Sequence, residues 1–93
     1  MTNEVVYKYE LPAGPSQLWL PKNAVILHVH EQRNGVCLWV RRPVDAEDAE
    51  RRKFWVVGTG HVLPAQDLRY HGTAHLAGGT LVLHVFEDDR RGE

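Results

Sequence analysis

Residues Ala24 to Arg42 read AVILHVHEQRNGVCLWVRR, and this segment is the clearest indication of the fold. Residues 24–31 are rich in Val, Ile and Leu, and this composition predicts a β-strand. Asn34-Gly35 follows, which is the strongest short signal for a β-hairpin. Residues 36–42 form the predicted return strand, with apolar side chains at alternate positions. The period is therefore that of a sheet and not that of a helix.

The same period of two extends to both sides of this hairpin. Val5, Tyr7, Tyr9 and Leu11 alternate with polar residues, as expected of a half-buried strand. Turn signals recur about every 8–12 residues, which predicts about seven short strands in a small antiparallel sandwich or barrel. Further strands are predicted at 17–20, 54–57, 69–76 and 80–87, with turns at 12–16, 58–60 and 78–79. We expect one all-β domain over residues 1–87 and a charged, frayed tail over 88–93.

Residues 43–53 differ in character from the strands around them. They are rich in Ala, Glu and Arg, and we expect an exposed loop with one or two helical turns and Asp45 as the N-cap. Acidic residues gather here and at 87–89. We expect neither group to lie in a cleft, so no acid/base pair stands out.

Bulk composition excludes several classes of protein. The 93 residues include 11 basic and 12 acidic side chains, a net charge of −1, so no global field attracts nucleic acid or anionic lipid. The single cysteine, Cys37, cannot form an intrachain disulfide, and the first residues do not resemble a signal peptide. No apolar run approaches the roughly 20 residues of a membrane helix. We expect a cytoplasmic protein with no membrane partner.

Cys37 and its neighbours also bear on chemistry and assembly. A thiol beside a histidine is a candidate nucleophile, but Cys37 lies in an apolar strand, where a free cysteine is usually a buried small hydrophobe. That strand is apolar on both faces, since Val36, Leu38 and Val40 oppose Cys37 and Trp39. Because both faces need cover, we expect a homo-oligomer.

Several short stretches, taken together, carry a resemblance. They are KYELP at 8–12, PKNAVIL at 21–27, CLW at 37–39, FWVVGTGH at 54–61, Gly72-Thr73, and LVLHVFE at 81–87. The set resembles a family of short uncharacterised bacteriophage and prophage proteins. The resemblance implies an accessory protein made in the cytoplasm of a bacterial host. Such proteins often bind host components, including defence proteins and their nucleotide signals.

The stretch Gly58-Thr59-Gly60-His61 is the first candidate binding site. Two glycines permit positive φ and expose successive backbone N–H groups, which can form an anion-binding nest. Thr59 and His61 would add a hydroxyl and a titratable ring. The alternative is a tight turn shaped for packing. Residues 72–75, Gly-Thr-Ala-His, echo the same Gly-Thr-x-His pattern.

Six histidines are a high count for this length. His28 and His30 are two residues apart, so both rings lie on one face of a strand, as in β-sheet metal sites. His84 or His75 would supply a third ligand, with zinc as the metal. The alternative is a pair of histidines on a solvent or interface face, and we expect no cofactor.

The three tryptophans and the cations around them suggest stacking and phosphate contacts. The set is Trp19, Trp39 and Trp55 with Arg41, Arg42, Arg51, Arg52 and Lys53, and it is countered by Asp45, Glu47, Asp48 and Glu50. This balance makes polymeric nucleic acid an unexpected partner. It leaves room for a small phosphorylated ligand.

The sequence therefore favours a phage-encoded, non-enzymatic binding module that counters host defence. It would engage a host protein or sequester a small phosphorylated or nucleotide ligand. The predicted ligand-binding residues are Gly58, Thr59, Gly60, His61, Trp39, Arg41 and His84. One alternative is a metal-dependent enzyme using His28, His30 and His84. A second is a structural virion or assembly component.

Overall fold

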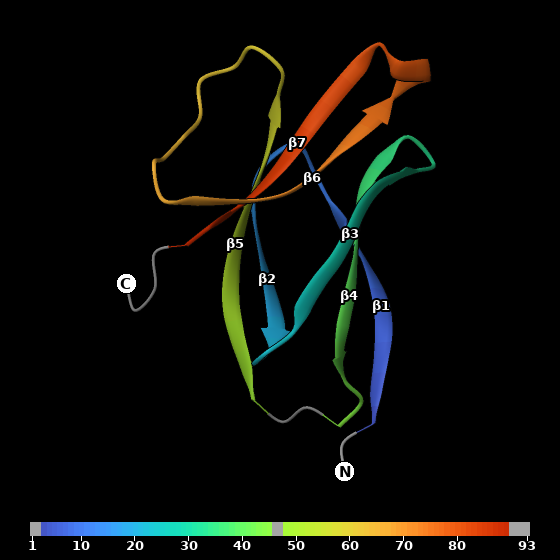
Figure 1. Cartoon of the computed structure of the whole chain (residues 1–93), viewed down its shortest axis with the longest axis vertical. Coiled ribbons are helices and arrows are strands. Elements are labelled where there is room, and N and C mark those ends of the chain that lie inside the picture. Colours follow the sequence, from blue (N-terminus) through green and yellow to red (C-terminus); the bar gives the residue numbers. More distant parts are fainter. Residues whose placement is uncertain (1–2, 46–47, 90–93) are drawn as a thin grey trace.

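The computed structural model describes residues 3–45 and 48–89, which form seven β-strands (Figure 1). A single 3₁₀ turn, η1, spans Ala77–Gly79, and the described part of the chain contains no α-helix. No helix in that part is long and apolar enough to cross a membrane. The strands are β1 (Glu4–Leu11), β2 (Gly14–Pro21), β3 (Val25–Gln32), β4 (Gly35–Pro43), β5 (Ala49–Gly58), β6 (Leu68–Leu76) and β7 (Leu81–Asp88).

The strands form two antiparallel sheets. One has three strands in the order β1-β4-β3, and the other has four in the order β2-β5-β7-β6. The two sheets pack as a sandwich and do not close into a barrel, because no ladder joins an edge strand of one to an edge strand of the other. The predicted all-β antiparallel fold is confirmed, and of its two forms the chain adopts the sandwich.

The β3–β4 hairpin is confirmed, but its turn lies one residue earlier than the Asn34-Gly35 signal suggests. Arg33 and Asn34 take positive φ values of 55° and 62°, the pattern of a type I′ turn. Gly35 already belongs to β4 and pairs with Gln32. A Cβ at Gly35 would lie 2.8 Å from Oε2 of Glu10, so a side chain there would displace the end of the Glu10 side chain.

The core lies between the inner faces of the two sheets. Its largest fully buried side chains are Phe54, Leu20, Leu38, Val40 and Val85. The strand period places each of them on the inner face, while most of their neighbours along the strand lie on the outer face and are partly or fully exposed.

The sheets approach each other most closely where β3 passes β6. A Cβ at Gly72 would lie 2.7 Å from Cβ of Val29, so only glycine allows this contact. A register shift between Tyr70 and Gly72 lies directly before it. This bulge allows His71 to join the buried side of the sheet, as described below.

The prediction of a helical turn over 43–53 is wrong wherever the structure describes those residues. β4 runs to Pro43, residues 44–45 form a turn, and β5 begins at Ala49. Asp45 is therefore not a helix N-cap, while residues 46–47 lie outside the described part. Residues 49–53 form a strand despite their helix propensity because they pair with β2. β2 starts at Gly14, earlier than expected, and all of its residues pair with β5.

The last strand also reaches further than expected. β7 ends at Asp88, and the backbone N–H of Asp89 donates to the carbonyl of Asp67. The tail expected to fray thus begins inside an ordered strand, and residues 90–93 lie outside the described part.

Candidate functional site

The predicted glycine loop is a tight turn at the end of β5. The N–H of His61 donates to the carbonyl of Gly58, and the N–H of Thr59 donates to the carbonyl of Val82. Gly60 has a φ of 89°, as the third residue of a type II turn requires. Two of the backbone donors expected in an anion-binding nest are thus already used by the fold. The loop therefore matches the alternative interpretation, a turn shaped for packing.

The side chains of this loop nevertheless take part in a hydrogen-bond chain centred on His84. Nε2 of His84 lies 2.7 Å from Oγ1 of Thr59, and Nδ1 lies 3.0 Å from Oγ1 of Thr73. The hydroxyl of Tyr70 lies 2.5 Å from the same oxygen of Thr73. The two Gly-Thr-x-His stretches therefore meet through their threonines, which hold both ring nitrogens of His84. This arrangement fixes the orientation of the ring.

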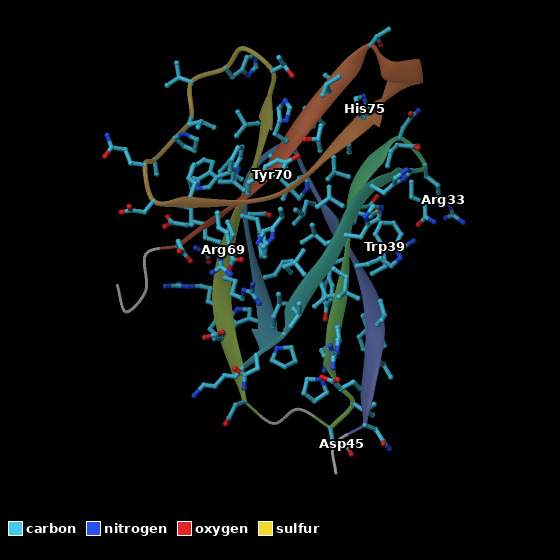
Figure 2. All side chains as sticks on the ribbon, in the orientation of Figure 1. Arg33, Trp39, Asp45, Arg69, Tyr70 and His75 are labelled. Atoms are coloured by element: carbon cyan, nitrogen blue, oxygen red, sulfur yellow. The ribbon has the colours of Figure 1, made fainter. Side chains whose placement is uncertain are left out.

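Trp39 and Arg41 do not join this group. They belong to β4 in the three-stranded sheet, and Nη2 of Arg41 lies 2.6 Å from Oε1 of Glu4. Figure 2 shows Trp39 beside β3 and β4, away from the loop that links β5 to β6. The register explains the separation, because Trp39 and His84 lie on the outer faces of different sheets. The predicted ligand set therefore divides into two surfaces.

The alternative metal set is divided in the same way. His28 and His30 share one face of β3, as predicted, and their rings stack with centroids 5.6 Å apart. His84 belongs to the other sheet, where it pairs with Thr73 of β6, and His75 lies two residues further along β6. Among residues 3–45 and 48–89, no three His, Cys, Asp or Glu side chains form a group that could hold a metal ion.

Cys37 is buried on β4, with 1% of its surface exposed. Burial raises the pKa of its thiol, with smaller influences from Lys8, Glu10 and Glu31. A protonated, buried thiol is a poor nucleophile, so the geometry supports a packing role for Cys37.

The most strongly built polar group in the described structure is a buried cluster of Arg52, Glu87 and His71. Nε and Nη2 of Arg52 donate to the two carboxylate oxygens of Glu87 at 2.6 and 2.8 Å, a bidentate pair. Nη1 of Arg52 donates to the carbonyl of Ala24 at 2.8 Å. Nε2 of His71 lies 2.8 Å from Oε1 of Glu87. The side chains of Arg52 and Glu87 are only 8% and 3% exposed.

These contacts set the charge of Glu87. Burial is the largest single influence and raises its pKa, but the hydrogen bonds and charges of Arg52 and His71 together lower the pKa from 4.5 to about 2. Glu87 is therefore ionised at neutral pH. Its carboxylate holds the guanidinium of Arg52 in one orientation.

A cavity of about 370 Å³ adjoins this cluster. It lies where the turn between β2 and β3 meets β5 and the start of β6, and Figure 2 shows Arg69 next to β5 in this region. The lining residues are Lys22, Asn23, Ala24, Glu50, Arg52 and Arg69. Arg69 also pairs with Asp89 at 2.6 Å, a contact whose side chains are about half exposed. The hydrogen bond from Arg69 to Asp89 raises the pKa of Arg69, which therefore remains a cation.

Sequence reasoning missed this cavity for an identifiable reason. Residues 43–53 were expected to be an exposed loop, so Arg52 was counted as a surface charge. The strand period does indicate that these two side chains face the core. Arg52 shares a strand face with Phe54 and Val56, and Glu87 shares one with Val85. The expectation that the acidic residues at 45–50 avoid any cleft is wrong for Glu50, which lines the cavity, whereas Glu87 is buried behind Arg52 with 2% of its surface exposed.

Comparison with known proteins identifies a family. The model of a domain of unknown function, DUF7352, matches residues 2–93. The chain belongs to the DUF7352 family. No curated protein and no solved structure matches it significantly. The resemblance to an uncharacterised family is thus confirmed, while the bacteriophage origin of this DUF7352 domain stays a prediction.

Proposed function

We propose that this DUF7352 protein binds a small phosphorylated ligand, without chemical turnover, in the cavity lined by Lys22, Arg52 and Arg69. The observation that carries this proposal is that three cationic side chains from three separate segments line one cavity. Its volume lies in the range of small-molecule sites, roughly 300–1,000 Å³. The class of ligand is the one expected from the sequence, but the residues are different.

Each cation has a distinct part in this proposal. Arg52 is fixed by Glu87 and Ala24, so little side-chain freedom remains to be lost when a ligand binds. Lys22 is exposed and supplies a mobile ammonium group. Arg69 is held by an exposed ion pair, which is weak enough for a phosphate to compete with Asp89.

The other lining residues restrict the ligand further. Asn23 offers an amide, and the carboxylate of Glu50 can accept a hydrogen bond from a hydroxyl group. No aromatic ring is among the described residues that line the cavity, so no stacking wall for a base is present there. These features favour a phosphorylated sugar, or the sugar-phosphate part of a nucleotide.

The test is an NMR titration of the ¹⁵N-labelled protein with ribose 5-phosphate, with ribose as the unphosphorylated control. We expect saturable shifts of the Lys22, Asn23 and Arg69 amides with ribose 5-phosphate only. Lys22→Gln removes one charged hydrogen bond and should weaken binding by about tenfold or more. Lys8→Gln, on the outer face of the other sheet, is the matched control and should not change the affinity. Shifts that are absent, or equal with ribose, contradict the proposal.

The wider setting of this activity rests on the sequence resemblance. A phage-encoded module that sequesters a nucleotide-derived signal in a bacterial host would counter host defence, and capture of a host protein is the competing form. An assay of phage growth on defended hosts, with and without Lys22→Gln, separates the two. If phage growth on the defended host falls when the protein carries Lys22→Gln, the result supports sequestration of the ligand. If growth is unchanged, it supports capture of a host protein.

Self-association is a second proposal, supported by apolar side chains on the outer face of the three-stranded sheet. Val6 and Val25 are about half exposed there, on either side of Arg41. A second copy would cover them. Native mass spectrometry reports the number of subunits and any bound mass, and a monomer at high concentration contradicts this proposal.

A further inference from the structure

The outer face of the four-stranded sheet gathers aromatic rings and cations that do not line the cavity described above. Strand pairing places Trp19 of β2 opposite Arg51 of β5, and Trp55 of β5 opposite Phe86 of β7. Tyr70 of β6 lies on the far side of Phe86. Lys53 lies between Arg51 and Trp55 on the same face of β5, because side chains alternate along a strand. We call these six residues the aromatic face: Trp19, Arg51, Lys53, Trp55, Tyr70 and Phe86.

Two rings at the ends of this face are open to solvent. The exposed fractions are 66% for Trp19 and 56% for Tyr70. Figure 2 shows Tyr70 on β6 where this strand passes β7. Tyr70 contacts Phe86, with ring centroids 5.6 Å apart and a tilt of 59°. A large exposed tryptophan is not needed for the core and marks a contact surface.

The cations lie between the two exposed rings. Nζ of Lys53 is 4.8 Å from the centre of the Trp55 ring, a cation–π contact. Arg51 is exposed beside Trp19. On β2, the residue opposite Trp55 is Pro15, and Trp19 lies four residues further along the strand. Trp19 and Trp55 are therefore separated by roughly 13 Å in the direction of the strands. A few nucleotides of an extended strand span such a distance.

We propose that the aromatic face binds single-stranded nucleic acid. Bases stack on Trp19 and on the Tyr70–Phe86 pair, while Arg51 and Lys53 contact the intervening phosphates. On the outer side of these four strands, within the described part of the chain, Asp88 is the single carboxylate, because Glu50 and Glu87 lie on the inner side. Such a partner was not expected from the sequence, because the net charge of the chain is −1. A net charge does not show how cations and aromatic rings are distributed over the surface.

The outer face of the other sheet is less suited to this partner. Glu4 neutralises Arg41 there, and Glu10 lies beside Cys37. A second copy packed on the aromatic face about a two-fold axis would bring like charges together. Charge complementarity therefore favours a polyanion on the aromatic face.

The experiment is fluorescence anisotropy of a labelled thymidine oligonucleotide of about ten residues, at several salt concentrations. We expect saturable binding that weakens with salt and is stronger than binding to the same sequence in a duplex. Trp19→Ala should weaken binding by about fivefold or more, since one stacked base is lost. The double variant Arg51→Gln/Lys53→Gln should reduce the slope of log K against log salt by about 1.4.

Matched controls lie on the opposite sheet. Tyr7→Ala removes a half-exposed ring, and Lys8→Gln removes an exposed cation; neither should change oligonucleotide binding. Lys22→Gln should also leave it unchanged, which separates this proposal from the cavity. Circular dichroism checks that Trp19→Ala folds. No saturable binding at low salt, or equal losses for Trp19→Ala and Tyr7→Ala, overturns the proposal.

Discussion

Two Arg–Glu pairs with the same shortest N–O distance lie in very different surroundings in this molecule. Arg41 and Glu4 approach to 2.6 Å on the outer face of one sheet, with side chains 56% and 39% exposed. Arg52 and Glu87 also approach to 2.6 Å, with side chains 8% and 3% exposed. The first pair is solvated and screened by salt, whereas the second has lost its water and depends on its partner. Distance alone therefore does not report what an ion pair contributes.

The largest expected effect comes from removing one charge of the buried pair. Glu87→Gln leaves the Arg52 guanidinium buried without a counter-charge, and we expect a loss of about 3–5 kcal/mol in the free energy of unfolding. Urea denaturation followed by circular dichroism measures it.

The double variant Arg52→Met/Glu87→Leu serves as the control for that loss. It removes both charges, so it should lose less stability than Glu87→Gln even if the single variant fails to fold. Equal losses for the two variants would mean that the cluster contributes shape and not charge.

The second effect is a dependence of stability on pH. The pKa of Glu87 is about 2 in the folded protein and near 4.5 in the unfolded chain. Because the folded value is the lower one, this stabilisation is complete above pH 4.5 and is lost as the pH falls toward 2. The difference corresponds to on the order of 3 kcal/mol. Glu87→Gln should flatten the urea-derived stability curve in this window.

The third effect concerns His71, which contacts the same carboxylate. His71→Phe keeps a ring of similar size beside Phe54 but removes the hydrogen bond to Glu87. We expect a loss of about 1.5–3 kcal/mol, since the acceptor is charged and buried. His75→Phe is the matched control, because His75 is exposed on the same strand. Equal stability of the two variants in urea would show that Arg52 alone satisfies Glu87.

The smallest effect should come from the exposed pair. Arg41→Gln is expected to change the free energy of unfolding by about 1 kcal/mol or less, and added salt should reduce that change further. A loss comparable to that of Glu87→Gln would remove the contrast between the two pairs.

Much of the fold could be predicted from local pattern, because a sheet with one buried face imposes a period of two. The β3–β4 hairpin and the strands from Arg69 to Glu87 follow this period, apart from the bulges between Ile26 and His28 and between Tyr70 and Gly72. Residues 49–53 were missed because their intrinsic preference is helical. Pairing with β2 overrides that preference, and a single strand does not encode the presence of its partner.

The candidate site was less predictable for a related reason. Thr59 and His84 were expected to share a site, and the structure brings them within hydrogen-bond distance. Trp39 and Arg41 were expected to join them, but they belong to the other sheet. Adjacency of strands within each sheet follows from long-range pairing, which short motifs do not report.

The all-β class, the hairpin and the side chains that share a strand face follow from the local sequence pattern, since these depend on neighbours one or two residues apart. The pairing of Arg52 with Glu87 depends on the folded chain, because this contact joins positions 35 residues apart. Desolvation makes that distant contact necessary. A buried charge is stable only beside a counter-charge, and the order of the strands in the sheet determines which residue is near enough to supply one.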